Sequence, residues 1–302
     1  MNKFVKDLFG ADNYVAIPID KIDTTLGHGN TLSVKIVVPT TCQANCDFCF
    51  NNYTKETKKY NFDKFLYNLK GSLEVIKKSL NNRKITIDIT GGEPTFTNRL
   101  YELLEILKSF KSERIVDRIV LTTNGFKLLR YNTLDPVDIV NVSIHDYRYP
   151  NRQSIFKTRL IPNNEDLKKI CKRFNTTAVA VCEKADDFEN FIINFANFSK
   201  ATGFKNARIR TNYLTDGDVF YKSFVDYEII HCSGLDKKLL TIDGFSVNLY
   251  RGVKDLTECV IGSEIVIDDD GLMYLDYNKR YMIDSDCLKD FDENIYVNLK
   301  TI

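Results

Sequence analysis

The sequence predicts an α/β protein built on a curved parallel sheet or incomplete barrel. Short β-branched runs alternate with helical patterns along most of the chain. The cores of these runs are short and β-branched, which suits strands that are buried on both faces of a parallel sheet. The length of 302 residues allows one large domain or two smaller ones. Alternation of this kind forms βαβ units with right-handed crossovers, and six such units make a curved sheet.

Each predicted element follows from its own pattern. The six strands are short and rich in β-branched residues: Leu32–Pro39, Lys84–Thr90, Asp117–Thr123, Asp138–His145, Thr176–Cys182 and Asn206–Asn212. Four helical patterns lie between them: Phe62–Leu80, Asn98–Phe110, Asn164–Phe174 and Asp186–Thr202. In the second of these, leucine and isoleucine recur at the three- and four-residue spacing of an amphipathic helix.

The last third of the chain has a different pattern. It is β-rich at Leu239–Ile242, Ser246–Tyr250 and Glu264–Ile267. The run of three aspartates and Gly271 that follows is a hairpin signal. We therefore expect a lead-in over residues 1–30, a core over 31–213, and a small β-rich C-terminal extension or cap over 214–302.

Composition excludes several classes of protein. The 42 basic and 41 acidic residues give a net charge of +1, which argues against nucleic acid as the main partner. No stretch approaches 18 apolar residues, so we expect no membrane span. The first residues contain no signal-peptide pattern, and we expect a cytoplasmic protein. In a reducing compartment, the eight cysteines indicate metal binding rather than disulfides.

The strongest motif is a group of three cysteines, Cys42, Cys46 and Cys49, directly after the first predicted strand. Three thiolates from one loop can converge on one metal centre. A structural zinc site normally has four protein ligands, and cubane iron–sulfur clusters take four cysteines. With three cysteines, one iron keeps the open position that a catalytic metal needs. The alternatives are a zinc site completed by a distant residue, or unrelated free thiols.

The second motif is Gly91-Gly92-Glu93-Pro94, at the end of the second predicted strand. Paired glycines let backbone approach a ligand closely, and Pro94 can open the following helix. Glu93 adds a carboxylate at the carboxyl end of a strand, where α/β folds place their sites. A tight strand–helix turn would explain these residues by itself. Their position one βα unit after the cysteines favours a functional site.

Together these residues resemble the radical S-adenosylmethionine (radical SAM) superfamily over about Leu32–Asn212. The cysteines fit its CX3CX2C pattern, with Phe48 at the usual aromatic position, and the second motif fits GGEP. The resemblance implies a (β/α)6 partial TIM barrel of parallel strands that holds a [4Fe–4S] cluster. It also implies reductive cleavage of S-adenosylmethionine to a 5′-deoxyadenosyl radical, which abstracts hydrogen from a small-molecule or peptide substrate. An external flavodoxin- or ferredoxin-like protein would supply the electron.

The resemblance also assigns contacts with the cofactor. Gly91, Gly92 and Glu93 would contact the methionine amino group, and the backbone near Phe48 would contact the adenine. In many members, polar groups at the ends of the third and fourth strands hold the ribose and carboxylate.

Candidates for these polar contacts are Asn124 and Ser143, although Asn124 also belongs to a dipeptide that favours turns. His145 is either a further contact or an ordinary polar residue at a strand end. Arg208 and Arg210 share one face of the sixth strand, so either could clamp a carboxylate if that face points inward. Outward-facing, solvated arginines are the alternative; Arg210 is the candidate cofactor contact.

The other cysteines carry weaker hypotheses. Cys171 fits a buried helix position. Cys182 ends the fifth strand, where it could donate a hydrogen atom to a substrate radical or simply pack. The hairpin around Gly271 resembles the opening of a SPASM or twitch domain, but no further cysteine follows soon after the glycine. We expect a degenerate SPASM-like cap, and the sequence does not decide whether a second cluster is bound by Cys232, Cys259 and Cys287.

An alternative function uses the same three cysteines without catalysis. A zinc protein or an iron–sulfur sensor would need no Gly91–Pro94 motif and would not cleave S-adenosylmethionine. The visible absorption of a cluster would separate an iron–sulfur protein from a zinc protein.

Overall fold

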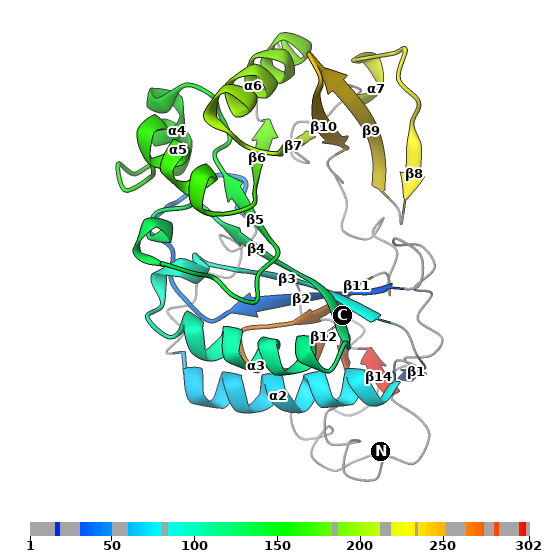
Figure 1. Cartoon of the computed structure of the whole chain (residues 1–302). Coiled ribbons are helices and arrows are strands. Elements are labelled where there is room, and N and C mark those ends of the chain that lie inside the picture. The colour runs from blue at the N-terminus through cyan, green and yellow to red at the C-terminus, as the bar shows by residue number, and fades with distance from the viewer. Residues whose placement is uncertain are drawn as a thin grey trace.

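A single curved sheet organises the chain (Figure 1). Within the described residues, fourteen strands follow the order β1-β14-β13-β12-β11-β2-β3-β4-β5-β6-β7-β10-β9-β8. The helices lie along one side of this sheet, and its two ends lie on the opposite, open side of the molecule (Figure 1). The computed structural model describes residues 16–18, 31–49, 60–79, 84–182, 187–211, 219–232, 235–251, 264–274, 281–283 and 296–299.

The six predicted strands are confirmed, each within a few residues of its expected bounds. They are parallel neighbours in chain order: β2 (Thr31–Val38), β3 (Lys84–Gly91), β4 (Val116–Thr123), β5 (Ile139–Ser143), β6 (Thr176–Cys182) and β7 (Asn206–Thr211). The four predicted helices are also present: α2 (Phe62–Ser79), α3 (Leu100–Ser112), α5 (Asn164–Arg173) and α6 (Phe188–Thr202).

Local signals set the ends of these helices. Asn163 and Asp166 form a reciprocal capping box that starts α5. Gly203, at φ 105°, ends α6 in the left-handed conformation that glycine adopts easily. Four short helices within the described residues were not predicted, because each has too few turns for a clear periodicity: η4 (Pro94–Phe96), η5 (Leu128–Arg130), α4 (Tyr149–Phe156) and α7 (Val219–Lys222). None of the helices in the described ranges is long and apolar enough to cross a membrane.

The β-rich pattern of the last third of the chain is confirmed, but its strands extend the core sheet at both edges. β10 (Phe245–Tyr250) pairs in parallel with β7, and β11 (Glu264–Ile267) pairs in parallel with β2. Eight parallel strands therefore lie side by side where six were expected. The edges of β2 and β7 carry open backbone donors and acceptors, which these added strands satisfy.

The remaining strands pair antiparallel outside these eight. At one end β9 pairs with both β10 and β8, and at the other end β12, β13, β14 and β1 follow β11. The predicted hairpin after β11 is present, with Gly271 at φ 78° in its turn. The bounds of these strands are β8 (Ile230–Cys232), β9 (Leu235–Ile242), β12 (Met273–Tyr274), β13 (Tyr281–Ile283), β14 (Tyr296–Leu299) and β1 (Ala16–Pro18).

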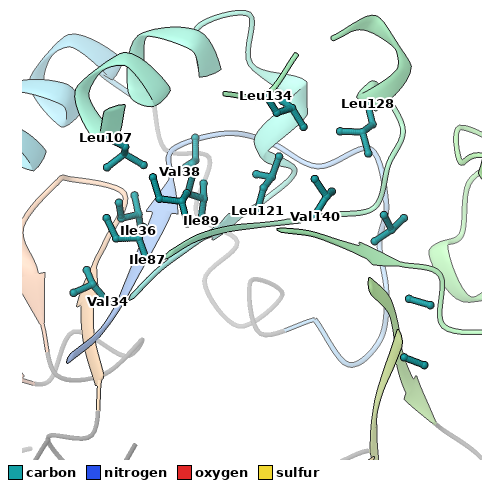
Figure 2. Packing of buried hydrophobic residues seen from close by; sticks show 14 of the residues in the cluster. Val34, Ile36, Val38, Ile87, Ile89, Leu107, Leu121, Leu128, Leu134 and Val140 are labelled. Atoms are coloured by element: carbon teal, nitrogen blue, oxygen red, sulfur yellow. The ribbon is translucent and has the colours of Figure 1, made fainter. Parts of the chain in front are cut away.

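The main hydrophobic core lies between the sheet and its helices. Alternate residues of each strand point into it, such as Ile87 and Ile89 of β3, and both are fully buried. In Figure 2 the labelled aliphatic side chains of β2 and β3 lie on the same side of the sheet as Leu107 of α3. We call this helix-covered side of the sheet the outer face.

The opposite side of the sheet, the inner face, is polar in its centre. Asp88 of β3 alternates with the buried isoleucines and accepts a hydrogen bond of 2.9 Å from the Thr122 hydroxyl of β4. The Asn141 amide of β5 donates in turn to the Thr122 hydroxyl at 3.3 Å. A chain of hydrogen bonds therefore crosses three strands on a face that a closed barrel would fill with apolar side chains.

Candidate functional site

The three cysteines lie on one loop, residues 39–49, at the carboxyl end of β2. We call this segment the cysteine loop. Cys42 is exposed, Cys46 is buried and Cys49 is half-buried, and all three thiols are free of disulfides. The Cys49 amide donates a 3.2 Å hydrogen bond to the Cys46 carbonyl, which forms a tight turn between these two residues.

The glycines of the GGEP turn lie directly against the start of this loop. A Cβ atom at Gly91 would stand 2.5 Å from the Val38 carbonyl oxygen, and one at Gly92 would stand 2.2 Å from the Thr40 carbonyl oxygen. Gly91 also has φ 138°, which side-chain-bearing residues rarely adopt. The close backbone approach predicted for these glycines is therefore used, at least in part, by the cysteine loop.

Glu93 fastens the same turn to two strands. Its Oε1 accepts hydrogen bonds from the Thr95 amide, at 2.9 Å, and from the hydroxyls of Thr95 and Thr123, each at 2.5 Å. Its Oε2 accepts from the Asn124 amide at 2.7 Å, while its own amide donates to the Thr41 carbonyl at 3.1 Å. Burial raises the pKa of this carboxyl, and the hydrogen bonds from Thr123, Thr95 and Asn124 counteract the rise.

Asn124 connects Glu93 and its hydrogen-bond partners to the first cysteine. Its side-chain amide donates to the Cys42 sulfur at 3.6 Å, and its carbonyl oxygen accepts from the Gln43 amide at 2.9 Å. The same oxygen accepts from the Phe126 backbone amide at 3.1 Å. The side chain predicted to hold the ribose or carboxylate is therefore engaged in orienting the cysteine loop.

The other side of the cysteine loop packs against helix α4 and strand β6. Cys46 and Phe48 form a small apolar cluster with Phe156, Ile161 and Val181. Backbone and side-chain bonds add to this cluster: the Asn45 amide donates to the Phe156 carbonyl at 3.0 Å, and Lys157 pairs with Asp47. The loop is thus held from both sides by segments that follow it by 40 to 140 residues in the sequence.

His145 is a packed residue beside this cluster. Its ring lies 4.8 Å from the Phe48 ring, and its Nδ1 accepts a 3.1 Å hydrogen bond from the Val181 amide. Burial first, and then the charge of Arg210, lower the pKa of His145 to about 3. The ring is therefore neutral, and because Nδ1 is an acceptor its proton lies on Nε2.

The donor chemistry of the loop fits an iron–sulfur cluster. Although Cys42 reaches solvent, nearby protein desolvates its thiol and raises its pKa to about 11, and the charges of Glu93 and Cys49 add to the rise. Thiols must lose their protons to ligate a metal, and a bound cation reverses such a rise. In the described ranges, no three His, Cys, Asp or Glu side chains are already gathered closely enough to hold a metal ion. Cluster ligation therefore requires the three thiols to turn toward one another.

The remaining predicted site residues have different positions. Ser143 is half-buried at the end of β5 and alternates with core residues, which places it on the inner face. Cys182 belongs to the main core on the outer face, whereas its neighbour Val181 contacts the cysteine-loop cluster. This position does not favour the hydrogen-donor role. Cys259 and Cys287 lie outside the described residues, and for Cys232 only the backbone is described.

Several residues of the site were not predicted from the sequence. Thr95 and Thr123 hold Glu93, Gln43 joins Asn124 to the loop, and Phe156 and Val181 pack against Phe48. Only Gln43 carried a local signal, since it lies between the first two cysteines. The others become visible only when the fold brings distant segments together.

Comparison with known proteins identifies the family of this region. The family model described as the radical SAM superfamily matches residues 36–182. A protein of Methanococcus aeolicus named "Probable GTP 3',8-cyclase" is 35% identical over 115 residues, 37% of this chain and 36% of that protein. A protein of Methanocaldococcus jannaschii, named provisionally as a glycyl-radical enzyme activating enzyme, is 31% identical over 129 residues, 42% of this chain and 45% of that protein. The matches thus span less than half the length of these relatives.

Solved structures share the fold. A structure described as native anSMEcpe with bound AdoMet and Kp18Cys peptide is 13% identical, with a TM-score of 0.53 over 82% of this chain and 74% of that chain. The same protein with bound AdoMet is 15% identical, with a TM-score of 0.52 over 83% and 77% of the two chains. At this identity the likeness concerns the fold alone. The family match, the cysteine loop and the GGEP turn together identify residues 36–182 as a domain of the radical SAM superfamily.

Proposed function

We propose that this chain is a radical SAM enzyme that acts on a small molecule or a peptide. The observation that carries the proposal is the direct contact between its two motifs. The GGEP glycines lie against the backbone of the cysteine loop. The Glu93 backbone amide donates a hydrogen bond to the Thr41 carbonyl at the start of that loop. A zinc protein or an iron–sulfur sensor would need the cysteines but would not need this turn beside them.

Cys42, Cys46 and Cys49 would hold a [4Fe–4S] cluster with one open iron. When bound, the cluster supplies the electron that cleaves S-adenosylmethionine and so initiates hydrogen abstraction from the substrate. The half-buried backbone of Gly91 and Gly92 can meet the methionine amino group. Glu93 is 1% exposed and accepts four hydrogen bonds, so we propose that it acts through the turn that it holds in place.

The other residues of the site would orient the cofactor and exclude water. Phe48 and Val181 belong to an apolar cluster with Cys46 that suits the adenine ring, and the neutral His145 ring packs edge-on against Phe48. Ser143 offers a hydroxyl on the inner face for the ribose or carboxylate. A separate flavodoxin- or ferredoxin-like protein would reduce the cluster. Peptide and small-molecule substrates both remain within this proposal.

The first test measures iron and sulfide after anaerobic purification. Wild type should carry about four irons per chain, and the Cys42→Ala/Cys46→Ala/Cys49→Ala variant should carry none. Cys171→Ala is the matched control, because this thiol is on the buried side of α5 and accepts a 3.3 Å hydrogen bond from Thr176. Loaded protein should form 5′-deoxyadenosine from S-adenosylmethionine when reductant is added. Zinc without iron, or a loaded protein that forms no 5′-deoxyadenosine, would refute the enzyme and favour the non-catalytic alternative.

A second test addresses the turn. Glu93→Gln keeps the size of the side chain but exchanges one acceptor oxygen for a donor, which opposes the hydroxyl and amide donors around it. We expect weaker S-adenosylmethionine binding and slower 5′-deoxyadenosine formation. Unchanged binding and turnover would show that Glu93 has no role in positioning the turn.

A further inference from the structure

Two arginines of β7 lie on the inner face of the sheet. Ala207 and Ile209 are fully buried in the outer core, so Arg208 and Arg210, which alternate with them, point to the other side. Both arginines are exposed. The burial of their neighbours therefore places both arginines on the inner face, where they remain accessible to solvent.

These arginines stand near the cysteine loop. Arg210 is the register partner of Val181 on the adjacent strand, and Val181 packs in the cluster that contains Phe48 and Cys46. Neighbouring strands lie about 4.8 Å apart, so Arg210 is one strand away from a residue that contacts the loop. Its charge also contributes to the lowered pKa of His145 at the end of β5.

The C-terminal part of the chain completes this region. In β10, Asn248 and Tyr250 are the parallel register partners of Arg208 and Arg210. The Tyr250 ring lies 5.6 Å from the Arg208 guanidinium, a cation–π contact that restricts the arginine without neutralising it. Among the described residues, no carboxylate lies within ion-pair distance of Arg208. In Figure 1, β7 and β10 lie side by side at the upper end of the curved sheet.

The spacing of the two guanidinium groups suits one oxyanion. Residues two apart on a strand are about 6.5–7 Å apart, and long side chains can converge from that separation on a shared ligand. Guanidinium groups bind carboxylate and phosphate through paired hydrogen bonds, and the planar fork makes this binding specific.

We propose that Arg208 and Arg210 bind an oxyanion of the substrate, a carboxylate or phosphate group, with Tyr250 orienting Arg208. The inference rests on the proposed function, because it takes the space beside the cysteine loop to be the reaction site. It narrows the substrate to an anionic molecule or to a peptide that presents a carboxylate. The C-terminal strand β10 then contributes to substrate recognition as well as to the sheet.

The chain contains no tryptophan, which permits a simple reporter. In a Tyr250→Trp background, the single tryptophan would stand beside Arg208. The full-length protein is titrated at constant ionic strength with inorganic phosphate and, separately, with succinate; neutral succinamide is the control ligand. We expect a saturable change in emission with at least one of the two anions and none with succinamide. The anion that binds more tightly identifies phosphate or carboxylate as the preferred group.

Variants assign the binding to the two arginines. In the reporter background, Arg208→Gln and Arg210→Gln should each weaken anion binding about tenfold or more, as expected for one charge-assisted interaction. Arg208→Lys keeps the charge but loses the fork and should show a smaller loss. Arg114→Gln, in the exposed turn before β4, should bind like the parent. Thermal unfolding of each variant verifies that it is folded.

Two results would overturn the proposal. One is the absence of a saturable response in the reporter protein, or anion binding by folded Arg208→Gln and Arg210→Gln that is as tight as in the reporter protein. The other is a response that disappears when iron-loaded protein is saturated with S-adenosylmethionine, because the arginines would then hold the carboxylate of the cofactor. Iron content and 5′-deoxyadenosine formation are measured on the same preparations. Failure of those two assays with intact anion binding would refute the proposed function and leave the anion site established.

Discussion

The two faces of the same sheet have opposite chemistry. On β3, Ile87 and Ile89 are fully buried against the helices, whereas Asp88 between them is half-buried on the inner face and bonded to Thr122. On β7, buried Ile209 separates two exposed arginines. Single strands therefore carry the stability of the fold on one side and the polar groups available to a ligand on the other. Substitutions at adjacent positions of a strand should have separable effects.

The largest effect on stability is expected on the outer face. Ile87→Ala removes fully buried aliphatic carbons from the main core and should lower the free energy of unfolding by about 2–5 kcal/mol. Asp88→Asn, at the next position, keeps an acceptor for Thr122 and should cost less than about 1 kcal/mol. Urea denaturation measures both. Equal losses would contradict the division between the two faces.

In the turn at the carboxyl end of β3, one substitution should affect both the stability of the fold and the binding of iron. Gly92→Ala would place a Cβ atom 2.2 Å from the Thr40 carbonyl, so the cysteine loop must move. We expect a loss of more than about 1 kcal/mol in stability, together with reduced iron content. Gly71→Ala is the matched control, since nothing outside the adjoining residues and backbone of α2 lies within 4 Å of the added methyl group. That variant should gain about 0.5–1 kcal/mol and load iron normally.

The third prediction concerns pH and the neutral ring of His145. The unfolded chain protonates this histidine below its ordinary pKa of about 6.5, whereas the folded protein keeps it neutral down to about 3. Its contribution to stability is therefore complete above pH 6.5 and is lost as the pH falls toward 3, by up to about 1.4 kcal/mol per pH unit.

The test replaces His145 by asparagine, which tolerates the positive φ of 59° at this position. Unfolding by urea is compared at pH 7, 6 and 5. The variant should be less stable at pH 7 but should lose less stability than wild type on acidification. Parallel losses in the two proteins would show that His145 does not titrate as described.

The smallest effect is expected at the end of β6, where two neighbouring residues face opposite sides. Cys182→Ala shortens a side chain in the outer core and should cost about 1 kcal/mol, with 5′-deoxyadenosine formation unchanged. Val181→Ala removes contacts in the cluster that holds Phe48 and should lower that formation. Loss of the substrate-derived product with Cys182→Ala, while 5′-deoxyadenosine formation and stability stay normal, would restore the hydrogen-donor hypothesis for this thiol.

Local patterns made much of the fold and part of the site predictable. The apolar runs of β2 to β7 carry their own strand signals, and Cys42, Cys46 and Cys49 form a motif within eight residues. The role of Glu93 was harder to predict from the sequence, because its partner Thr123 lies thirty residues later and on another strand. The sequence therefore indicates that Glu93 matters, but only the fold shows what its carboxylate accepts.

Local patterns also could not predict which strands pair with the two edges of the core sheet. The periodicity of Phe245–Tyr250 and Glu264–Ile267 predicts strands, but it contains no information about their neighbours. Their pairing depends on the open edges of β7 and β2, which lie far away in the sequence. For the same reason, the boundary expected near residue 213 stays a prediction, since strands from both sides of it share one sheet.

The pairing of β11 with β2 has a consequence for the synthesis of the protein. Strand β2 is the first core strand to leave the ribosome. Its edge partner β11 is made only after more than two hundred further residues. At about 5–20 residues per second, β7 waits a few seconds for β10, whereas β2 waits roughly ten seconds or more for β11. Throughout that interval both edges of the nascent sheet can pair with other chains. A chaperone that covers exposed strand edges should therefore bind this protein on the ribosome and leave once residue 267 has emerged.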